Sequence, residues 1–210
     1  MIGKELENNQ ANIIGVVAGG FEFNHEIYGE AFYTMDLKVE RLSASSDIIP
    51  VMISERLIDV TKNHDGVLMS VEGQFRSYNR HDEHKNKLVL SVFAREVEVL
   101  DTVDEDRQTN HVYLEGFVCK EPIYRKTPLG REIADLLIAV NRPYGKSDYI
   151  PCISWGRNAK YAGNFQVGEK VAIWGRIQSR EYMKKISEEV MEKRVAYEVS
   201  VSKLETLEVL

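Results

Sequence analysis

Cysteine is scarce in this sequence and histidine is dispersed, which argues against disulfide and metal chemistry. The chain has two cysteines among 210 residues, Cys119 and Cys152. Two cysteines form no disulfide framework and supply too few ligands for a zinc site, so we expect two buried thiols. The nearest pair among the five histidines, His81 and His84, lies in the polar run 79–87, which is typical of a solvated loop.

Long apolar runs and catalytic motifs are also missing. No stretch reaches the roughly 18 apolar residues that a transmembrane helix needs, and the N-terminus has no signal peptide, so we expect a cytoplasmic protein that contacts no membrane. We find no Walker loop, no zinc motif, and no Ser-His-Asp or Cys-His arrangement. We therefore expect a non-enzymatic protein without a cofactor.

The chain as a whole lacks net positive charge, although its second half is positively charged. The formal net charge is −6 at pH 7. Residues 1–100 carry −6, residues 101–108 carry −3, and residues 109–210 carry +3. Because affinity for nucleic acid depends on Lys and Arg that displace counterions, only the second half is suited to bind phosphates.

One pattern occurs twice in the chain. A shift of 101 residues aligns Asn9 with Asn110, Gly15 with Gly116, Gly29 with Gly130, Asp47 with Asp148, and Ile49-Pro50 with Ile150-Pro151. With one extra residue, G-Q-F-R-S at 73–77 aligns with G-R-I-Q-S at 175–179. The repeat predicts two copies of a small β domain, 1–100 and 109–210, joined by an acidic linker at 101–108.

The order of elements within each copy predicts a fold class. In the second copy we expect strands near 110–120, 131–141 and 147–156, a helix of two turns at 157–163, and strands at 170–182 and 195–207, with a charged hairpin at 183–194. Five strands with one helix between the third and fourth is the order of an OB-fold. The sequence therefore predicts an all-β protein of two tandem OB-folds, each with one short helix.

The segment 147–156, S-D-Y-I-P-C-I-S-W-G, predicts a strand that shows aromatic rings to solvent. Period-two alternation places Tyr149, Pro151, Ile153 and Trp155 on one face and Ile150, Cys152 and Ser154 on the other. Rings flanked by cations are typical of a nucleic-acid-binding surface. The alternative is a strand buried on both faces, with its tryptophan in the core.

The residues 109–207 resemble the bacterial single-stranded DNA-binding proteins. The motifs that carry the resemblance are N-H-V-Y-L-E-G, E-P-I-Y-R-x-T-P-L-G, L-L-I-A-V-N-R, D-Y-I-P-C-I-S-W-G-R-x-A and G-x-I-Q-S-R-x-Y, in that order. The resemblance implies stacking rings at Tyr144, Tyr149, Trp155 and Tyr182. It implies groove cations at Arg125, Arg131, Arg142, Arg157, Arg176, Arg180, Lys184 and Lys185.

The first copy resembles the family only weakly. Its counterparts of Tyr149 and Trp155 are Ile48 and Ser54, so we expect that it has lost most of its stacking surface. Family members usually end in an acidic tip that recruits replication and repair proteins, whereas this sequence stops at L-E-T-L-E-V-L, so we expect no recruitment of that kind. Because the family typically assembles four barrels, a homodimer would supply the same number.

The strand at 170–182 leaves two interpretations open. Its alternation places Trp174, Arg176, Gln178 and Arg180 on one face, which suits either DNA contacts or an ordinary solvated surface. Trp174 could also pack against the other copy or a second subunit.

Together these features favour sequence-tolerant binding of single-stranded DNA by the second copy, with unstructured RNA as a possible further ligand. A nucleoid-associated role in replication, recombination or repair would follow. The alternative is a non-enzymatic adaptor or primosomal-type accessory protein that binds a protein partner through the acidic first copy.

Overall fold

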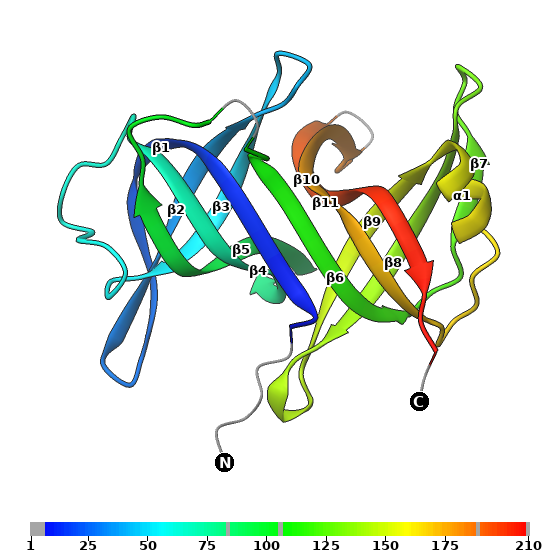
Figure 1. The fold of residues 1–210 in the computed structure, drawn as a ribbon, viewed down its shortest axis with the longest axis horizontal. Helices are drawn as coiled ribbons and strands as arrows, with labels where there is room; N and C mark the ends of the chain where they lie inside the picture. The colour runs from blue at the N-terminus through cyan, green and yellow to red at the C-terminus, as the bar shows by residue number, and fades with distance from the viewer. Residues whose placement is uncertain (1–6, 83–84, 105–106, 188–189, 209–210) are drawn as a thin grey trace.

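The computed structural model describes all residues except 1–6, 83–84, 105–106, 188–189 and 209–210. It contains eleven strands, one α-helix and one short 3-10 helix within the described residues. Figure 1 shows two barrels side by side, the first built from the N-terminal half of the chain and the second from the C-terminal half. The predicted all-β OB-fold class is confirmed.

The first barrel is closed by pairing of its five strands in the order β1-β2-β3-β5-β4-β1. These strands are β1 (Asn9–Ile27), β2 (Glu30–Glu40), β3 (Ser46–Ser54), β4 (Leu68–Asp82) and β5 (Lys85–Val99). All the pairs are antiparallel except β3 with β5. The polar run at 79–87 belongs to the β4–β5 hairpin, and its side chains lie outside the described part of the structure.

The second barrel repeats this pairing with β6, β8, β9, β11 and β10. Its elements are β6 (Asn110–Val118), β7 (Ile123–Lys126), β8 (Glu132–Asn141), the 3-10 helix η1 (Pro143–Gly145), β9 (Ser147–Trp155), α1 (Gly156–Ala162), β10 (Lys170–Lys185) and β11 (Met191–Thr206). The last two strands are longer than expected, because pairing continues to Lys185 and Met191, so the expected hairpin at 183–194 is largely strand.

The helix expected in each barrel is present in the second barrel as α1, between β9 and β10. In the first barrel, residues 55–67 form turns instead. Side chains there bond to nearby backbone groups: Asp59 Oδ1 accepts from the Thr61 N–H at 3.1 Å, and Asn63 Oδ1 accepts from the Asp65 N–H at 3.0 Å. Such local bonds compete with the helical ladder.

The repeated glycines allow close approach of neighbouring strands inside each barrel. A Cβ at Gly15 would lie 2.3 Å from the Lys38 carbonyl oxygen, and a Cβ at Gly116 would lie 2.5 Å from the Ala139 carbonyl oxygen. Both positions therefore exclude any larger residue, and the two barrels curl at equivalent places.

The barrels are joined into one continuous sheet by β1 and β6. These strands pair antiparallel from Asn9 opposite Leu114 to Ile13 opposite Asn110. Figure 1 shows the two strands side by side in the middle of the molecule.

Two further contacts, which we call the barrel junction, are related by the internal repeat. Ser179 of the second barrel donates from its N–H and its hydroxyl to Asp47 Oδ1 of the first, at 2.7 and 2.8 Å. In the equivalent contact, the Ser77 N–H of the first barrel donates to Asp148 Oδ1 of the second at 2.8 Å. The interface between the barrels therefore has approximate twofold symmetry.

Candidate nucleic-acid interface

The outer face of β9 carries two half-exposed aromatic rings. Tyr149 is 45% exposed and Trp155 is 39% exposed, whereas Ile150 and Cys152 face the core. Trp155 is the last residue of the strand, because Gly156 adopts a left-handed φ of 57° and starts α1. The alternation expected from the sequence is present, except that Ile153 on the outer side is buried.

The outer face of β10 carries cationic side chains two strands away from these rings. Only β11 separates β10 from β9 in the sheet. Arg176, Gln178 and Arg180 alternate along β10 with the buried Ile177 and with Ser179 of the junction. We call this combined surface, Tyr149 and Trp155 with Arg176 and Arg180, the stacking face.

Glu198 on β11 holds the polar part of the stacking face in place. Its carboxylate is almost fully buried and accepts a hydrogen bond from Gln178 Nε2 at 2.8 Å. The same Oε1 atom lies 3.8 Å from Arg180 Nε. Glu198 therefore offsets part of the positive charge of this face, and it was not anticipated from the sequence, although its place opposite Gln178 follows from the strand register.

Arg142 lies at the barrel junction, beside Asp148. Its Nε lies 3.2 Å from Asp148 Oδ2, and the Asp148 side chain is fully buried. Burial raises the pKa of Asp148 above its ordinary value, against the hydrogen bond from Ser77 and the charges of Arg142 and Arg76. Arg142 thus compensates a buried carboxylate and has less charge to offer a phosphate than the sequence suggested.

Asp47, the counterpart of Asp148, has the opposite shift. Burial again acts to raise its pKa, but hydrogen bonds from Arg41 and Ser179 outweigh this effect and lower the pKa of Asp47. Arg41 donates from Nε to Asp47 Oδ2 at 2.6 Å and from Nη2 to the Ser179 carbonyl oxygen at 3.0 Å. This half of the junction is therefore more fully hydrogen-bonded.

The other expected cations are spread along the rim of the second barrel. Arg125 on β7 is paired with Asp135, with its Nε 3.0 Å from Oδ2. Arg131, in the turn after β7, and Arg157, two residues beyond Trp155, are exposed. Lys184 is half-buried and Lys185 is exposed at the far end of β10.

Tyr182 and Tyr144 also lie on the second barrel. Tyr182 is 37% exposed on β10, opposite Arg194 of β11, which the sequence did not single out. Tyr144 is fully exposed in η1 with a φ of 64°. Tyr144 thus forms the tip of the turn between β8 and β9.

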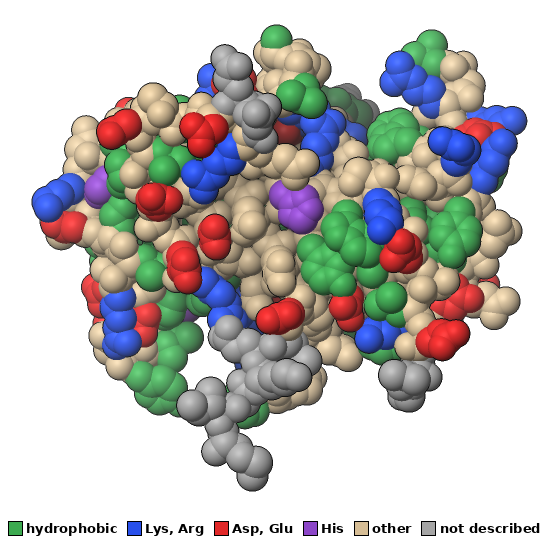
Figure 2. Space-filling model, viewed as in Figure 1, with side chains coloured by type: hydrophobic (Ala, Val, Ile, Leu, Met, Phe, Trp, Pro, Cys, Tyr) green, Lys and Arg blue, Asp and Glu red, His purple; other side chains and the backbone are tan. Residues whose placement is uncertain are grey.

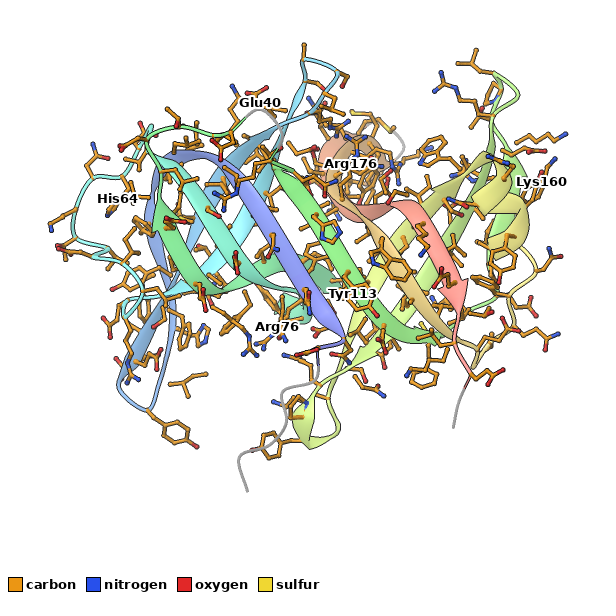
Figure 3. The ribbon with its side chains drawn as sticks, viewed as in Figure 1. Glu40, His64, Arg76, Tyr113, Lys160 and Arg176 are labelled. Carbon is orange, nitrogen blue, oxygen red and sulfur yellow. The ribbon has the colours of Figure 1, made fainter. Side chains whose placement is uncertain are left out.

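Trp174 packs with the strands that connect the barrels. Its ring centroid lies 5.1 Å from that of Tyr113 on β6, and Lys203 Nζ lies 4.4 Å from the Trp174 ring. Figure 3 places Tyr113 near the middle of the molecule, and Figure 2 shows hydrophobic side chains gathered there beside a histidine. This environment favours the packing interpretation of Trp174 over a DNA contact.

Neither a metal-binding cluster nor a membrane-spanning helix occurs among the described residues. They contain no group of three or more His, Cys, Asp or Glu side chains that could hold a metal ion. None of their helices is long and apolar enough to cross a membrane.

The two five-stranded barrels belong to the OB-fold class. The "Single-strand binding protein family" matches residues 109–207. The second half of the chain therefore belongs to the single-strand binding protein family, as its motifs implied.

Curated relatives agree with this assignment. Over 80 residues, 35% of the chain, it is 38% identical to "Single-stranded DNA-binding protein 2" of Listeria innocua, covering 50% of that protein. It is 36% identical to "Single-stranded DNA-binding protein A" of Bacillus subtilis over the same length, covering 46% of that protein. The chain thus spans about half the length of the curated relatives it matches.

The complete two-barrel fold has a counterpart among solved structures. The wild-type single-stranded DNA binding protein from Thermus aquaticus superimposes with a TM-score of 0.75 at 19% identity, covering 99% of this chain and 95% of that one. Both barrels and their arrangement are therefore a known fold.

Proposed function

We propose that this protein binds single-stranded DNA without strong sequence preference, mainly through the stacking face of the second barrel. The observation that carries the proposal is the pair of half-exposed rings, Tyr149 and Trp155, on β9. The strand lies in a domain of the single-strand binding protein family, and the curated relatives are named for the same ligand.

The proposed mechanism needs no chemical step and no cofactor. Bases stack on Tyr149 and Trp155, and phosphates pass Arg157, Arg176 and Arg180. Each stacked base contributes about 1 to 3 kcal/mol whatever its identity, because every base has a π-face. Duplex DNA hides these faces within its own stack, so selectivity for single strands follows.

Tryptophan fluorescence tests the proposal directly. Both tryptophans of the chain lie in the second barrel, and the variant Trp174→Phe would leave Trp155 as the only reporter. We expect oligo(dT) to quench this fluorescence to saturation, whereas a duplex of the same length should not. Absence of quenching at low salt, with no binding detected by a second method, would refute the proposal.

We also propose that residues 101–108 are the linker between two domains, 1–100 and 109–210. We further propose that two chains associate, which brings four barrels together. The surface suited to this contact is the one around Tyr113 and Trp174, because aromatic residues are enriched at the cores of protein interfaces. Analytical ultracentrifugation should give about twice the mass of one chain. A monomer at micromolar concentration would contradict this assembly.

A protein-binding adaptor is the second candidate function. It is favoured by the β1–β2 hairpin of the acidic first barrel, where Phe23, Ile27 and Tyr28 are exposed. If the chain failed to bind oligo(dT), this hairpin would be the surface to test against basic protein partners.

A further inference from the structure

The first barrel has no aromatic residues at the positions that carry the stacking rings in the second. The counterpart of Trp155 is Ser54, which is buried and donates its hydroxyl to Glu30 Oε1 at 2.5 Å. The counterpart of Tyr149 is Ile48. Strand β3 by itself therefore offers no aromatic stacking surface, as the comparison of the two copies suggested.

The neighbouring strands nevertheless place rings around the Ser54 position. Phe32 of β2 lies directly opposite Ser54 in the strand register, and Phe93 of β5 lies opposite Met52. The two phenyl centroids are 5.8 Å apart and tilted by 30°. The first barrel thus carries rings on the equivalent outer face, at the level where Trp155 lies in the second barrel, but from different strands.

A protein group lies over one face of each ring, which leaves the other face and the edges for a ligand. The His25 imidazole lies parallel to Phe32, with a centroid separation of 5.0 Å and an angle of 8°. The Arg76 guanidinium carbon lies 4.1 Å from the centroid of Phe93. Aromatic faces and guanidinium planes are the surfaces on which unpaired bases stack. The row His25, Phe32, Phe93 and Arg76 therefore has the chemistry of a base-stacking surface.

Positive charge gathers at the Arg76 end of this row. Gln74 Oε1 accepts from Arg76 Nε at 3.0 Å and from Nη2 at 2.6 Å, which fixes the guanidinium plane. Burial lowers the pKa of Arg76 to about 10; the charge of Arg142 acts in the same direction, the Asp148 carboxylate opposes it, and Arg95 adds a smaller effect in the direction of burial. Arg76 remains protonated at neutral pH, and a phosphate placed here would add to the partial compensation that Asp148 gives to Arg76 and Arg142.

The row is also continuous with the stacking face. Arg76 is followed in β4 by Ser77, whose hydroxyl accepts a hydrogen bond from the Tyr149 N–H at 2.7 Å. Figure 3 shows Arg76 at the lower edge of the first barrel, on the side that faces the second. Arg76 is therefore the neighbour, along β4, of the residue that contacts the Tyr149 backbone.

We propose that Phe32, Phe93 and Arg76 form a second base-stacking site for single-stranded nucleic acid, on the first barrel. The site extends the path of a strand that is bound at Tyr149 and Trp155, so the inference rests on the proposed function. It assigns DNA contacts to the acidic half of the chain, where the sequence indicated that most of the stacking surface is lost.

The test compares oligo(dT) of increasing length on the full chain with the double variant Phe32→Leu/Phe93→Leu. Leucine preserves apolar volume but removes the π-face. Phe23→Leu is the matched control, because Phe23 is an exposed phenylalanine of the same barrel that packs edge-on against Tyr33, outside the row. Tryptophan quenching reports only on the second barrel, so the same signal is read in all three proteins.

We expect short oligomers to bind wild type and double variant equally. Long oligomers should bind the double variant at least about tenfold more weakly and saturate it at a shorter length, because one or two stacked bases are lost. Unchanged binding of long oligomers would overturn the inference while leaving the proposed function intact. An equal loss for short and long oligomers would also overturn it, since the rings would then act through the second barrel.

Photocrosslinking uses the wild-type protein, so its result does not depend on whether a variant folds. Oligo(dT) containing 5-iododeoxyuridine should crosslink to peptides that contain Phe32 or Phe93. Crosslinks confined to the second barrel would overturn the inference. If the wild-type chain bound no oligomer at all, both this site and the proposed function would be refuted.

Discussion

Removing the two rings of the stacking face should abolish most single-strand binding without unfolding the protein. Tyr149 and Trp155 are each exposed by about two fifths, and neither belongs to the buried core. More than half of each ring is nevertheless buried, so exchange of both for alanine should also lower the thermal midpoint, and thermal denaturation must show that the variant is still folded at the assay temperature.

The expected loss of affinity follows from the stacking energy. Two bases at about 1 to 3 kcal/mol each amount to about 2 to 6 kcal/mol, which corresponds to a weakening of about 30-fold to 10⁴-fold. The salt dependence should change little, because Arg157, Arg176 and Arg180 remain in place.

Fluorescence anisotropy of labelled oligo(dT) measures this loss in the absence of Trp155. Tyr28→Ala is a suitable control, because Tyr28 is a fully exposed tyrosine between β1 and β2 of the first barrel and does not belong to the stacking face. If Tyr149→Ala/Trp155→Ala bound oligo(dT) with wild-type affinity, the rings would not be the contact surface.

Three further changes test the fold and the junction. Gly116→Ala should lower the free energy of unfolding by about 3 kcal/mol, because the new Cβ would meet the Ala139 carbonyl oxygen. Urea denaturation should therefore show a lower midpoint, and an unchanged midpoint would contradict the close approach of the two strands. Trp174→Ala should weaken self-association and leave oligo(dT) affinity within about twofold, as sedimentation and anisotropy would show; the reverse pattern would assign Trp174 to DNA. The pKa of Asp47 is lowered, so the wild type should lose its stability advantage over Asp47→Asn as the pH falls below about 4. The pKa of Asp148 is raised, so the wild type should gain stability relative to Asp148→Asn as the pH falls through that pKa. Urea unfolding between about pH 3 and 7 measures both differences, and the same pH dependence for both would refute the opposite shifts.

The local features of the fold could be predicted because they depend on short-range patterns. Alternation along 147–156 identified which side chains of β9 face outward, and the spacing of Gly15 and Gly116 identified equivalent curls in the two barrels. Ile153 is the exception on β9, because strands on both sides, at Asp135 and Ser200, cover its position.

Contacts between the barrels could not be predicted in this way. Asp148 and Ser77 are separated by 71 residues, and no periodicity connects them. The shift of 101 residues did align Asp47 with Asp148, but the repeat alone does not show that each carboxylate accepts a hydrogen bond from the opposite barrel. Arg142 was therefore expected in a groove, although its charge compensates Asp148.

The rings of the first barrel were missed for a related reason. The alignment of the two copies pairs Trp155 with Ser54, and serine has no aromatic ring. Phe32 and Phe93 become neighbours of that position only through the strand register. A duplicated barrel can thus keep an aromatic surface in space while it loses the aromatic residues in the alignment.

The junction shows where the two copies have diverged in charge. At Asp47, one carboxylate is matched by Arg41 and two donors of Ser179, so this half is neutral and well hydrogen-bonded. At Asp148, Arg142 and Arg76 both act on one carboxylate, which leaves net positive charge beside Tyr149. The two arginines that act on Asp148 therefore have no full equivalent at Asp47, where Arg41 matches the carboxylate, so the internal symmetry of the junction does not extend to its charge.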